Sequence, residues 1–253
     1  RGSWRDDTDH RPPPPALAVG DTLASAYAGA GDARVVDVSS LSPRLVRLAL
    51  DATLRARLFE VGAPVQYSYM DRALTLAEVQ TPYASRPWAA EMPSAGRALT
   101  TSILVALRRR GVDVARITAA AGLSATGDAA LDRLLPFPEQ YEISREAAAQ
   151  IDAARARGGR VIAVGTSTVR ALESAARDDG SVQAGRAIAS LIISPRTQTR
   201  VVDALLSGMH EAGTSHDSLL RAFAPAALVD AAIELGRRRG LLVHELGDHC
   251  VIL

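Results

Sequence analysis

The sequence of 253 residues contains no lysine and no asparagine, and all 29 of its basic residues are arginine. The absence of lysine excludes a Schiff-base lysine and a phosphate-loop lysine, and the absence of asparagine excludes base recognition by that side chain. Because 28 acidic residues leave a net charge of only +1, the chain has no basic coat for nucleic acid, although a local RNA-binding patch stays open. An apolar fraction of 47% excludes disorder as a description of the whole chain.

Cysteine is nearly absent as well. The single Cys250 excludes an internal disulfide framework and a thiolate metal cluster, so we expect a cytoplasmic location. No apolar run approaches the length of a membrane span, and no signal segment is recognisable, so we expect no membrane partner. Since the first residue is Arg1 rather than methionine, we expect the chain to be a processed, truncated or incomplete one. The oligomeric state cannot be read from the sequence.

The pattern of apolar residues changes along the chain. Residues 1–15 are polar and then proline-rich, which predicts an extended loop or linker. Residues 16–50 hold short β-like runs, which predict part of a small inserted β domain completed by upstream strands. From 51 to 253 helical and strand-like patterns alternate, which predicts a main α/β domain with a mixed, partly parallel sheet and flanking helices.

These patterns give definite element ranges. Helices are predicted at Ala52–Glu60, Leu99–Arg110, Ser144–Arg157, Ser167–Arg177, Thr214–Phe223 and Ala226–Arg239. Strands are predicted at Asp21–Tyr27, Ala33–Ser39, Arg44–Leu50, Val112–Thr118, Arg160–Val164, Leu191–Ser194, Val201–Leu206 and Leu241–Glu245.

A turn of small residues follows the apolar run that ends at Val164. Gly165 and Thr166 open a helix there, where free amide groups and the helix dipole favour an anion. Arg170 and Glu173 are three residues apart and share a helix face. The segment is therefore either a cradle for a carboxylate or phosphate, or an ordinary helix start with a surface ion pair. The spacing alone favours the ordinary helix start.

Three further segments hold side chains capable of chemistry. His210 precedes a helix start at which Thr214 and Asp217 have capping-box spacing. Proton transfer by His210 and a purely structural role of this residue are equally supported. Metal binding by His210 is not favoured. Two segments hold Gln80, Tyr83, Ser94, Ala95 and Gly96, and they either line a pocket or form structured loops, which physical reasoning alone favours. In the C-terminal tail, Asp248 lies beside Cys250, for which burial as a small apolar side chain is favoured over a nucleophile.

In this order, the segments resemble the S-adenosylmethionine:tRNA ribosyltransferase-isomerase family of queuosine biosynthesis. Five collinear pieces over about two thirds of the chain carry the resemblance. They are Gln80-Thr81-Pro82-Tyr83-Ala84, Pro93-Ser94-Ala95-Gly96, the run from Arg157 to Glu173, the run from Val201 to His210, and Gly247-Asp248.

The resemblance implies S-adenosylmethionine as co-substrate and no metal. In the family reaction the sulfonium acidifies the neighbouring 5′-methylene, adenine and methionine leave, and an amine on a 7-deazaguanine of tRNA takes up the rearranged ribose. The resemblance marks the positions, and we assign the roles: His210 is the expected proton-transfer residue. Substrate-binding residues are then Gln80, Tyr83, Ser94, Ala95, Gly96, Gly165, Thr166, Arg170, Glu173, Thr214 and Asp248.

Two alternatives stay open at this point. The family's A-G-L-H-F reads Ala95-Gly96-Arg97-Ala98-Leu99 here, and its Thr-Asp pair is replaced by Ala189-Ser190. These losses and the low net charge favour a small-molecule acceptor in place of tRNA. The other alternative is a non-catalytic S-adenosylmethionine-binding protein, against which the retained Gly165, Arg170 and His210 argue.

Overall fold

The structure is a computed structural model that describes residues 16–43, 45–65, 70, 72–84, 86–89, 91–123, 129–210, 212–242 and 246–253. The proposed linker of residues 1–15 lies outside the described residues. The chain forms two compact units, one of Arg1–Glu78 with Ala125–Leu134 and one of Val79–Ser124 with Leu135–Leu253. The boundary falls between Glu78 and Val79, whereas the change in sequence pattern placed the start of the α/β domain at residue 51.

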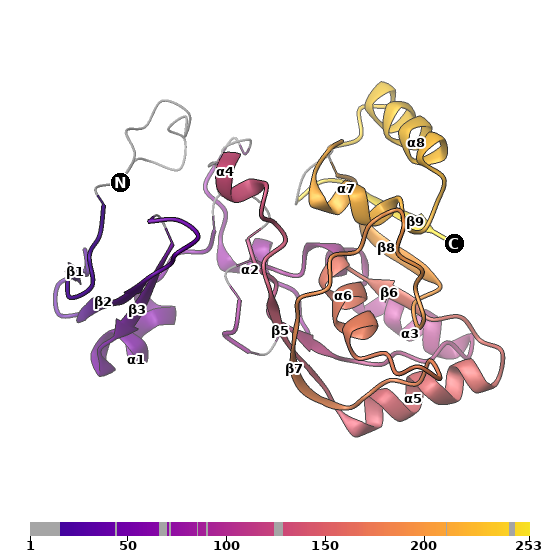
Figure 1. Cartoon of the computed structure of the whole chain (residues 1–253), viewed down its shortest axis with the longest axis horizontal. Coiled ribbons are helices and arrows are strands. Elements are labelled where there is room, and N and C mark those ends of the chain that lie inside the picture. Colours follow the sequence, from indigo (N-terminus) through magenta and orange to yellow (C-terminus); the bar gives the residue numbers. More distant parts are fainter. Residues whose placement is uncertain are drawn as a thin grey trace. The chain divides into compact units, whose positions relative to one another are not determined.

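The first unit contains an antiparallel sheet and a capped helix (Figure 1). The strands β1 (Thr22–Ala24), β2 (Asp32–Val38) and β3 (Val46–Leu50) pair in sequence order. Helix α1 (Ala52–Val61) follows directly, and the short helices α2 (Leu76–Val79) and α4 (Ala129–Asp132) come later in the chain. The Asp51 carboxylate caps α1 by accepting the Leu54 N–H at 2.7 Å and also accepts the Asp32 N–H at 2.6 Å, so it ties the helix to the sheet.

The second unit contains two three-stranded sheets. The antiparallel sheet has the order β4 (Thr118–Ala119), β5 (Glu139–Ile143), β7 (Gly185–Ala189). The mixed sheet has the order β6 (Ile162–Val164), β8 (Ala204–Gly208), β9 (His249–Ile252), with β6 parallel and β9 antiparallel to β8. Its helices are the 3-10 helix η2 (Ser94–Ala98), α3 (Thr101–Arg109), α5 (Arg145–Ala156), α6 (Thr166–Ser174), α7 (Ser215–Leu220) and α8 (Ala226–Arg238).

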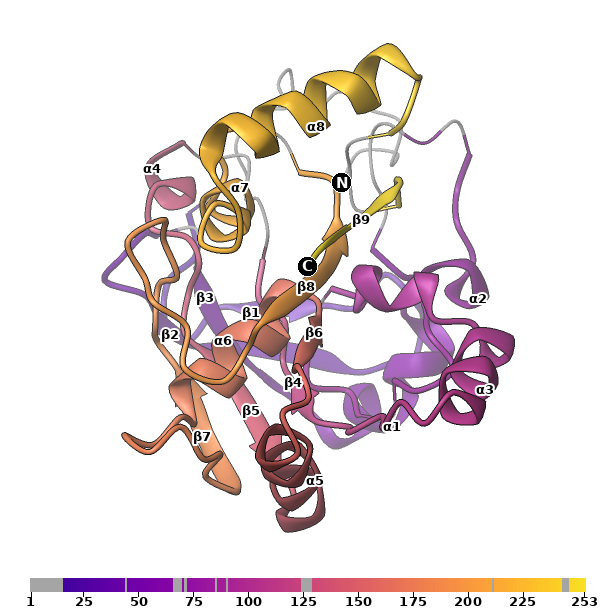
Figure 2. The ribbon, with the colours of Figure 1, turned by 90° about the vertical axis from the view of Figure 1, so that its right-hand side faces the viewer.

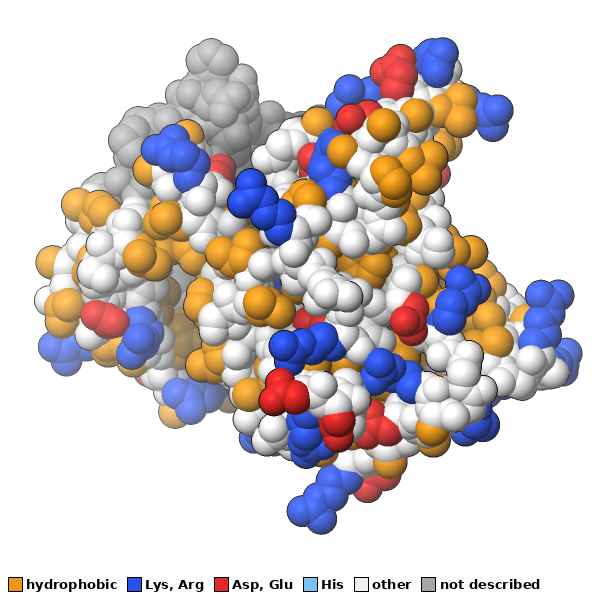
Figure 3. Space-filling view, turned by 45° about the vertical axis from the view of Figure 1, so that its right-hand side comes forward, with side chains coloured by type: hydrophobic (Ala, Val, Ile, Leu, Met, Phe, Trp, Pro, Cys, Tyr) orange, Lys and Arg blue, Asp and Glu red, His pale blue; other side chains and the backbone are white. Residues whose placement is uncertain are grey.

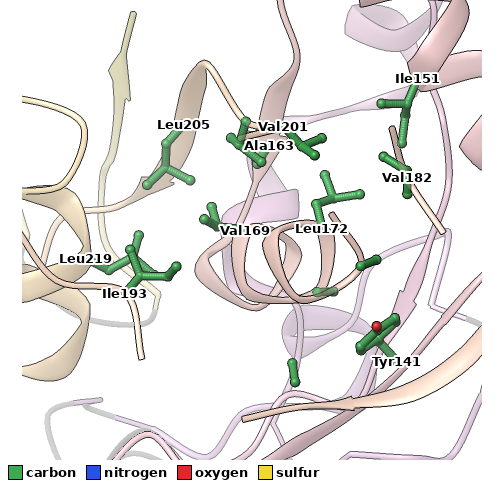
Figure 4. Close-up of a cluster of buried hydrophobic side chains, with 14 of the residues drawn as sticks. Tyr141, Ile151, Ala163, Val169, Leu172, Val182, Ile193, Val201, Leu205 and Leu219 are labelled. Carbon is green, nitrogen blue, oxygen red and sulfur yellow. The ribbon is translucent and has the colours of Figure 1, made fainter. Parts of the chain in front are cut away.

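Helix α6 forms the centre of the core. It lies between the antiparallel and the mixed sheet, and it packs against strands of both (Figure 2). Val169 and Leu172 on α6 are almost fully buried, and Tyr141, Ile151, Ala163 and Leu205 surround them (Figure 4). Burial of such side chains contributes about 1.5–3 kcal/mol each, so this cluster fixes where both ends of α6 lie.

The predicted mixed α/β class agrees with the structure, and helices occur at all the predicted helical positions. Two predicted strands are wrong: of Val112–Thr118 only Thr118 is in a strand, and Leu191–Ser194 is irregular, with Ile192 60% exposed. The predicted strand Val201–Leu206 begins later, at Ala204. Strands β5, β7 and β9 were not predicted, and part of the predicted Leu241–Glu245 strand lies outside the described residues. None of the helices in the described part of the chain is long and apolar enough to cross a membrane.

Candidate functional site

The carboxyl ends of the parallel strands β6 and β8 bring two of the predicted segments together. Val164 of β6 pairs with Leu206 of β8, and the Gly165 N–H donates to the Leu206 carbonyl at 2.9 Å. The chain therefore leaves both strands at the same edge of the sheet, where open α/β folds bind ligands.

Gly165 makes a left-handed turn at this edge. Its φ of +91° is a conformation that glycine adopts readily, and no side chain caps α6, which begins at Thr166. The Ala95 side chain lies 3.6 Å from the position that a Cβ on Gly165 would occupy, so η2 is in van der Waals range of the turn. The first amides of α6 thus start beside the segment Ser94–Gly96.

Tyr83 fixes η2 from the other side. Its hydroxyl donates to the Gly96 carbonyl, and burial raises the pKa of the phenol. A Cβ on Gly96 would overlap the Tyr83 hydroxyl, which explains why glycine occupies this position. Gln80 is exposed, and its side-chain carbonyl accepts the Thr81 N–H at 2.9 Å.

His210 is held at the end of β8 by two contacts. Its Nε2 lies 3.0 Å from the Oγ of Ser207, a buried residue, and its ring stacks on that of His216 with centroids 4.6 Å apart and an interplanar angle of 17°. Burial, with a smaller contribution from His216, lowers the pKa of His210 from 6.5 to about 3, while Asp217 acts in the opposite direction. The imidazole is therefore neutral at pH 7, and the same burial makes it a weaker proton acceptor than a free imidazole.

The predicted cap at Thr214 is confirmed. The Thr214 hydroxyl accepts the Asp217 N–H at 3.1 Å, and the Asp217 carboxylate accepts the Gly213 N–H at 2.9 Å. Asp217 also pairs with Arg221, whose Nη2 lies 2.7 Å from Asp230. The role of Thr214 in the structure is to start α7, the helix that carries His216.

Strand β9 brings the C-terminal tail to the same edge. His249 pairs with Gly208 in the sheet, and its Nε2 lies 3.1 Å from the Ser94 carbonyl. The backbone of Asp248 accepts the Met209 N–H at 3.0 Å, and its Oδ2 accepts the Leu242 N–H at 2.8 Å. Asp248 is thus at the edge with one carboxylate oxygen engaged in a turn.

Cys250 of β9 points its thiol toward the Gly208 carbonyl, 3.6 Å away. Burial raises the pKa of this thiol. Because the thiolate is the nucleophilic form, the raised pKa disfavours the nucleophile interpretation and favours the packing one.

The structure corrects the proposed carboxylate-binding role of Arg170. The side chain is buried, with Nη1 2.7 Å from Glu139 Oε2, Nε donating to the Leu191 carbonyl and Nη2 donating to the carbonyls of Phe137 and Ala189. All three guanidinium nitrogens face protein acceptors, because α6 turns this residue into the core rather than toward the β6–β8 edge.

Glu173 is corrected in the same way. It does not form the expected pair with Arg170, since its carboxylate accepts the backbone N–H groups of Arg200, Val201 and Val202 at 2.8–3.0 Å. It anchors the chain that leads into β8.

Most of the predicted residues divide into two sets, to which the exposed Gln80 and the α7 cap Thr214 do not belong. Those at or beside the β6–β8 edge are Tyr83, Ser94, Ala95, Gly96, Gly165, Thr166, His210 and Asp248, whereas Arg170 and Glu173 support α6 from within. Ser207, His216 and Glu139 also support the site and were not predicted. Ser207 could have been found from its position three residues before His210, but nothing local indicates the other two. Within the described residues, no group of three or more His, Cys, Asp or Glu side chains is placed to hold a metal ion.

Comparison with known proteins identifies the family. The family model described as queuosine biosynthesis protein matches residues 11–252. The S-adenosylmethionine:tRNA ribosyltransferase-isomerase of Acidiphilium cryptum is 33% identical over 90% of this chain and 69% of that protein. The enzyme of the same name from Thermus thermophilus is 35% identical over 87% of this chain and 64% of that protein. The chain belongs to the queuosine biosynthesis protein family.

A solved structure supports the fold. The crystal structure of S-adenosylmethionine tRNA ribosyltransferase from Thermotoga maritima matches with a TM-score of 0.52 at 22% identity. The match covers 92% of this chain and 65% of that one. The chain thus spans about two thirds of the length of the relatives that it matches.

Proposed function

We propose that this chain catalyses S-adenosylmethionine-dependent ribosyl transfer and isomerisation, with a base of tRNA as acceptor. One observation supports this most strongly: the segments around Ser94, Gly165, His210 and Asp248 meet at one sheet edge beside a neutral histidine. Relatives named for this reaction match nearly the whole chain, which favours tRNA over a small-molecule acceptor and an enzyme over a binding protein.

The start of α6 is our proposed cradle for the methionine carboxylate. The amides after Gly165 have no capping side chain, and the positive end of the helix dipole favours an anion there. Ser94, Ala95 and Gly96 form the adjoining wall. Within the described residues the Oδ1 atom of Asp248 has no hydrogen-bond partner, and we propose that it accepts a hydrogen bond from a ribose hydroxyl or from the methionine ammonium group.

His210 is our proposed proton-transfer residue. A base must remove a proton from the carbon next to the sulfonium, and the His210 imidazole, neutral at pH 7, has a ring nitrogen that accepts one. The burial that lowers its pKa also makes it a weaker base than a free imidazole. Ser207 and His216 are positioning residues, because the first contacts Nε2 and the second stacks on the ring. The sulfonium itself activates the carbon, so we propose no metal in this step.

Arg170 has an indirect role in this proposal. Its ion pair with Glu139 holds α6 against β5, and Glu139 also accepts the Gly122 N–H at 2.8 Å and lies 3.3 Å from the Ser167 hydroxyl. The pair therefore fixes the position of the α6 N-terminus relative to β5 and to the loop at Gly122. We further propose a cytoplasmic location, where tRNA is modified. We also propose that residues 16–50 are part of a small β domain.

Incubating the protein with S-adenosylmethionine and total tRNA tests the reaction. Nucleoside mass spectrometry of the recovered tRNA should show a ribose-derived mass gain on a 7-deazaguanine nucleoside. A parallel incubation without S-adenosylmethionine is the control. Unchanged tRNA, with S-adenosylmethionine bound in a separate calorimetric titration, would contradict the proposed acceptor.

A further inference from the structure

The outer face of the β4–β5–β7 sheet carries a cluster that the proposed reaction does not use. Along β5, Glu139, Tyr141 and Ile143 are buried, and Tyr141 lies on the α6 side of the sheet (Figure 4). By strand alternation Gln140 and Glu142 point to the opposite face. Glu142 binds Arg86 there, which places the segment 86–89 over this face.

Two arginines and a tryptophan share this face. The guanidinium carbon of Arg86 lies 4.9 Å from the Trp88 ring centre, and that of Arg186 on β7 lies 5.7 Å from it. Glu142 pairs with both arginines, at 2.7 Å from the Arg186 Nε. Two cations face one carboxylate, so the cluster keeps one net positive charge, and cation–π contacts hold the guanidinium groups near the ring.

Beside this cluster the surface is hollowed. A depression of about 450 Å³ is lined by Pro87, Trp88 and Ala89, by the loop 120–123, and by Pro138, Glu139 and Gln140. This volume is within the range of small-molecule pockets. Gln140 at its margin is exposed and offers both a hydrogen-bond donor and an acceptor.

We propose that this hollow binds an unpaired nucleobase of RNA, stacked against Trp88, with Arg86 and Arg186 close to the neighbouring phosphates. An aromatic side chain and arginines on an exposed sheet face suit a single-stranded base, since every base has a flat π-face and a charged backbone. Arginine and acidic side chains are interspersed on the face that Figure 3 shows. The choice of RNA rests on the proposed function, in which the acceptor is a tRNA base.

Fluorescence of Trp88 gives a direct test. The chain has two tryptophans, so Trp4→Phe leaves Trp88 as the single reporter. A short RNA hairpin with an unpaired loop should quench this fluorescence, and a continuous duplex of the same composition should not. Trp88→Ala should weaken hairpin binding by about 5- to 150-fold, whereas Trp88→Phe, which keeps a stacking ring, should retain most of the affinity.

An arginine pair provides the matched control. Arg186 and Arg238 are similarly exposed, at 71% and 67%, and each is paired with one glutamate. Arg186→Gln should reduce the salt dependence of RNA binding by about one phosphate contact, and Arg238→Gln on α8 should leave it unchanged. Equal affinities of Trp88→Ala and the unchanged chain, or no quenching by the hairpin, would overturn the inference. Calorimetric titration with S-adenosylmethionine alone tests the proposed function separately.

Discussion

Lowering the pH from 7 to 5 should reduce the free energy of unfolding by about 2 kcal/mol through His210 alone. The pKa of this imidazole is about 3 in the folded chain and 6.5 as the ordinary value. Between pH 7 and 5, His210 therefore becomes protonated in the unfolded chain but not in the folded chain. Since the folded pKa lies well below pH 5, the loss depends almost wholly on titration in the unfolded state. The free energy of unfolding therefore has its full value, as far as His210 is concerned, above pH 6.5, and it decreases as the pH falls toward 3.

Urea unfolding followed by circular dichroism at several pH values measures this effect. Carboxylates with lowered pKa, such as Asp51 and Glu142, also destabilise the fold in acid, so the informative quantity is the difference between the unchanged chain and His210→Gln. The variant should lack the loss of about 2 kcal/mol between pH 7 and 5. If both proteins lose the same stability over this interval, burial does not lower the pKa of His210, and the packing described around its ring is refuted.

Two further predictions concern the packing that supports the edge. Arg170→Ala should destabilise the fold by about 3–5 kcal/mol, because it leaves the buried Glu139 carboxylate without its ion-pair partner. Adding Glu139→Gln should recover part of this loss. A loss below about 1 kcal/mol in urea unfolding would refute the role of Arg170 in the core. Gly96→Ala should cost about 1–3 kcal/mol because the new Cβ overlaps the Tyr83 hydroxyl, and Tyr83→Phe in the same chain should recover part of the loss; thermal melts showing no loss would contradict the packing.

The helices were predictable because residues adjacent in the sequence determine where each helix begins and ends. Asp51, Ser144 and Thr214 each cap the helix that follows, as their side chains and positions indicate. Strand β5 was not predictable from pattern, because Glu139 is a charged residue at a buried position and only its distant partner Arg170 makes this burial tolerable. The apolar Leu191–Ser194 misled for the opposite reason, since Leu191 and Ile192 remain exposed.

In the candidate site, too, the features set by local sequence were predictable and those set by distant contacts were not. The turn at Gly165 and the position of His210 follow from strand ends and helix starts, which short sequence segments show. The contacts that determine the role of Arg170 come from Phe137, Glu139, Ala189 and Leu191, none of them close to it in sequence. The His210–His216 stack likewise requires the turn between β8 and α7, which spacing alone does not define.

The most direct test of the account is the rate at which adenine and methionine are released from S-adenosylmethionine by His210→Gln in the presence of tRNA, measured by mass spectrometry in a single turnover. The unchanged chain should release both products in equal amounts, with a matching gain in mass on the tRNA. The variant should bind S-adenosylmethionine with unaltered affinity in calorimetry, yet release the products about 10²- to 10⁴-fold more slowly. Release by the variant at the rate of the unchanged chain would contradict the assignment of proton transfer to His210 and with it the central claim.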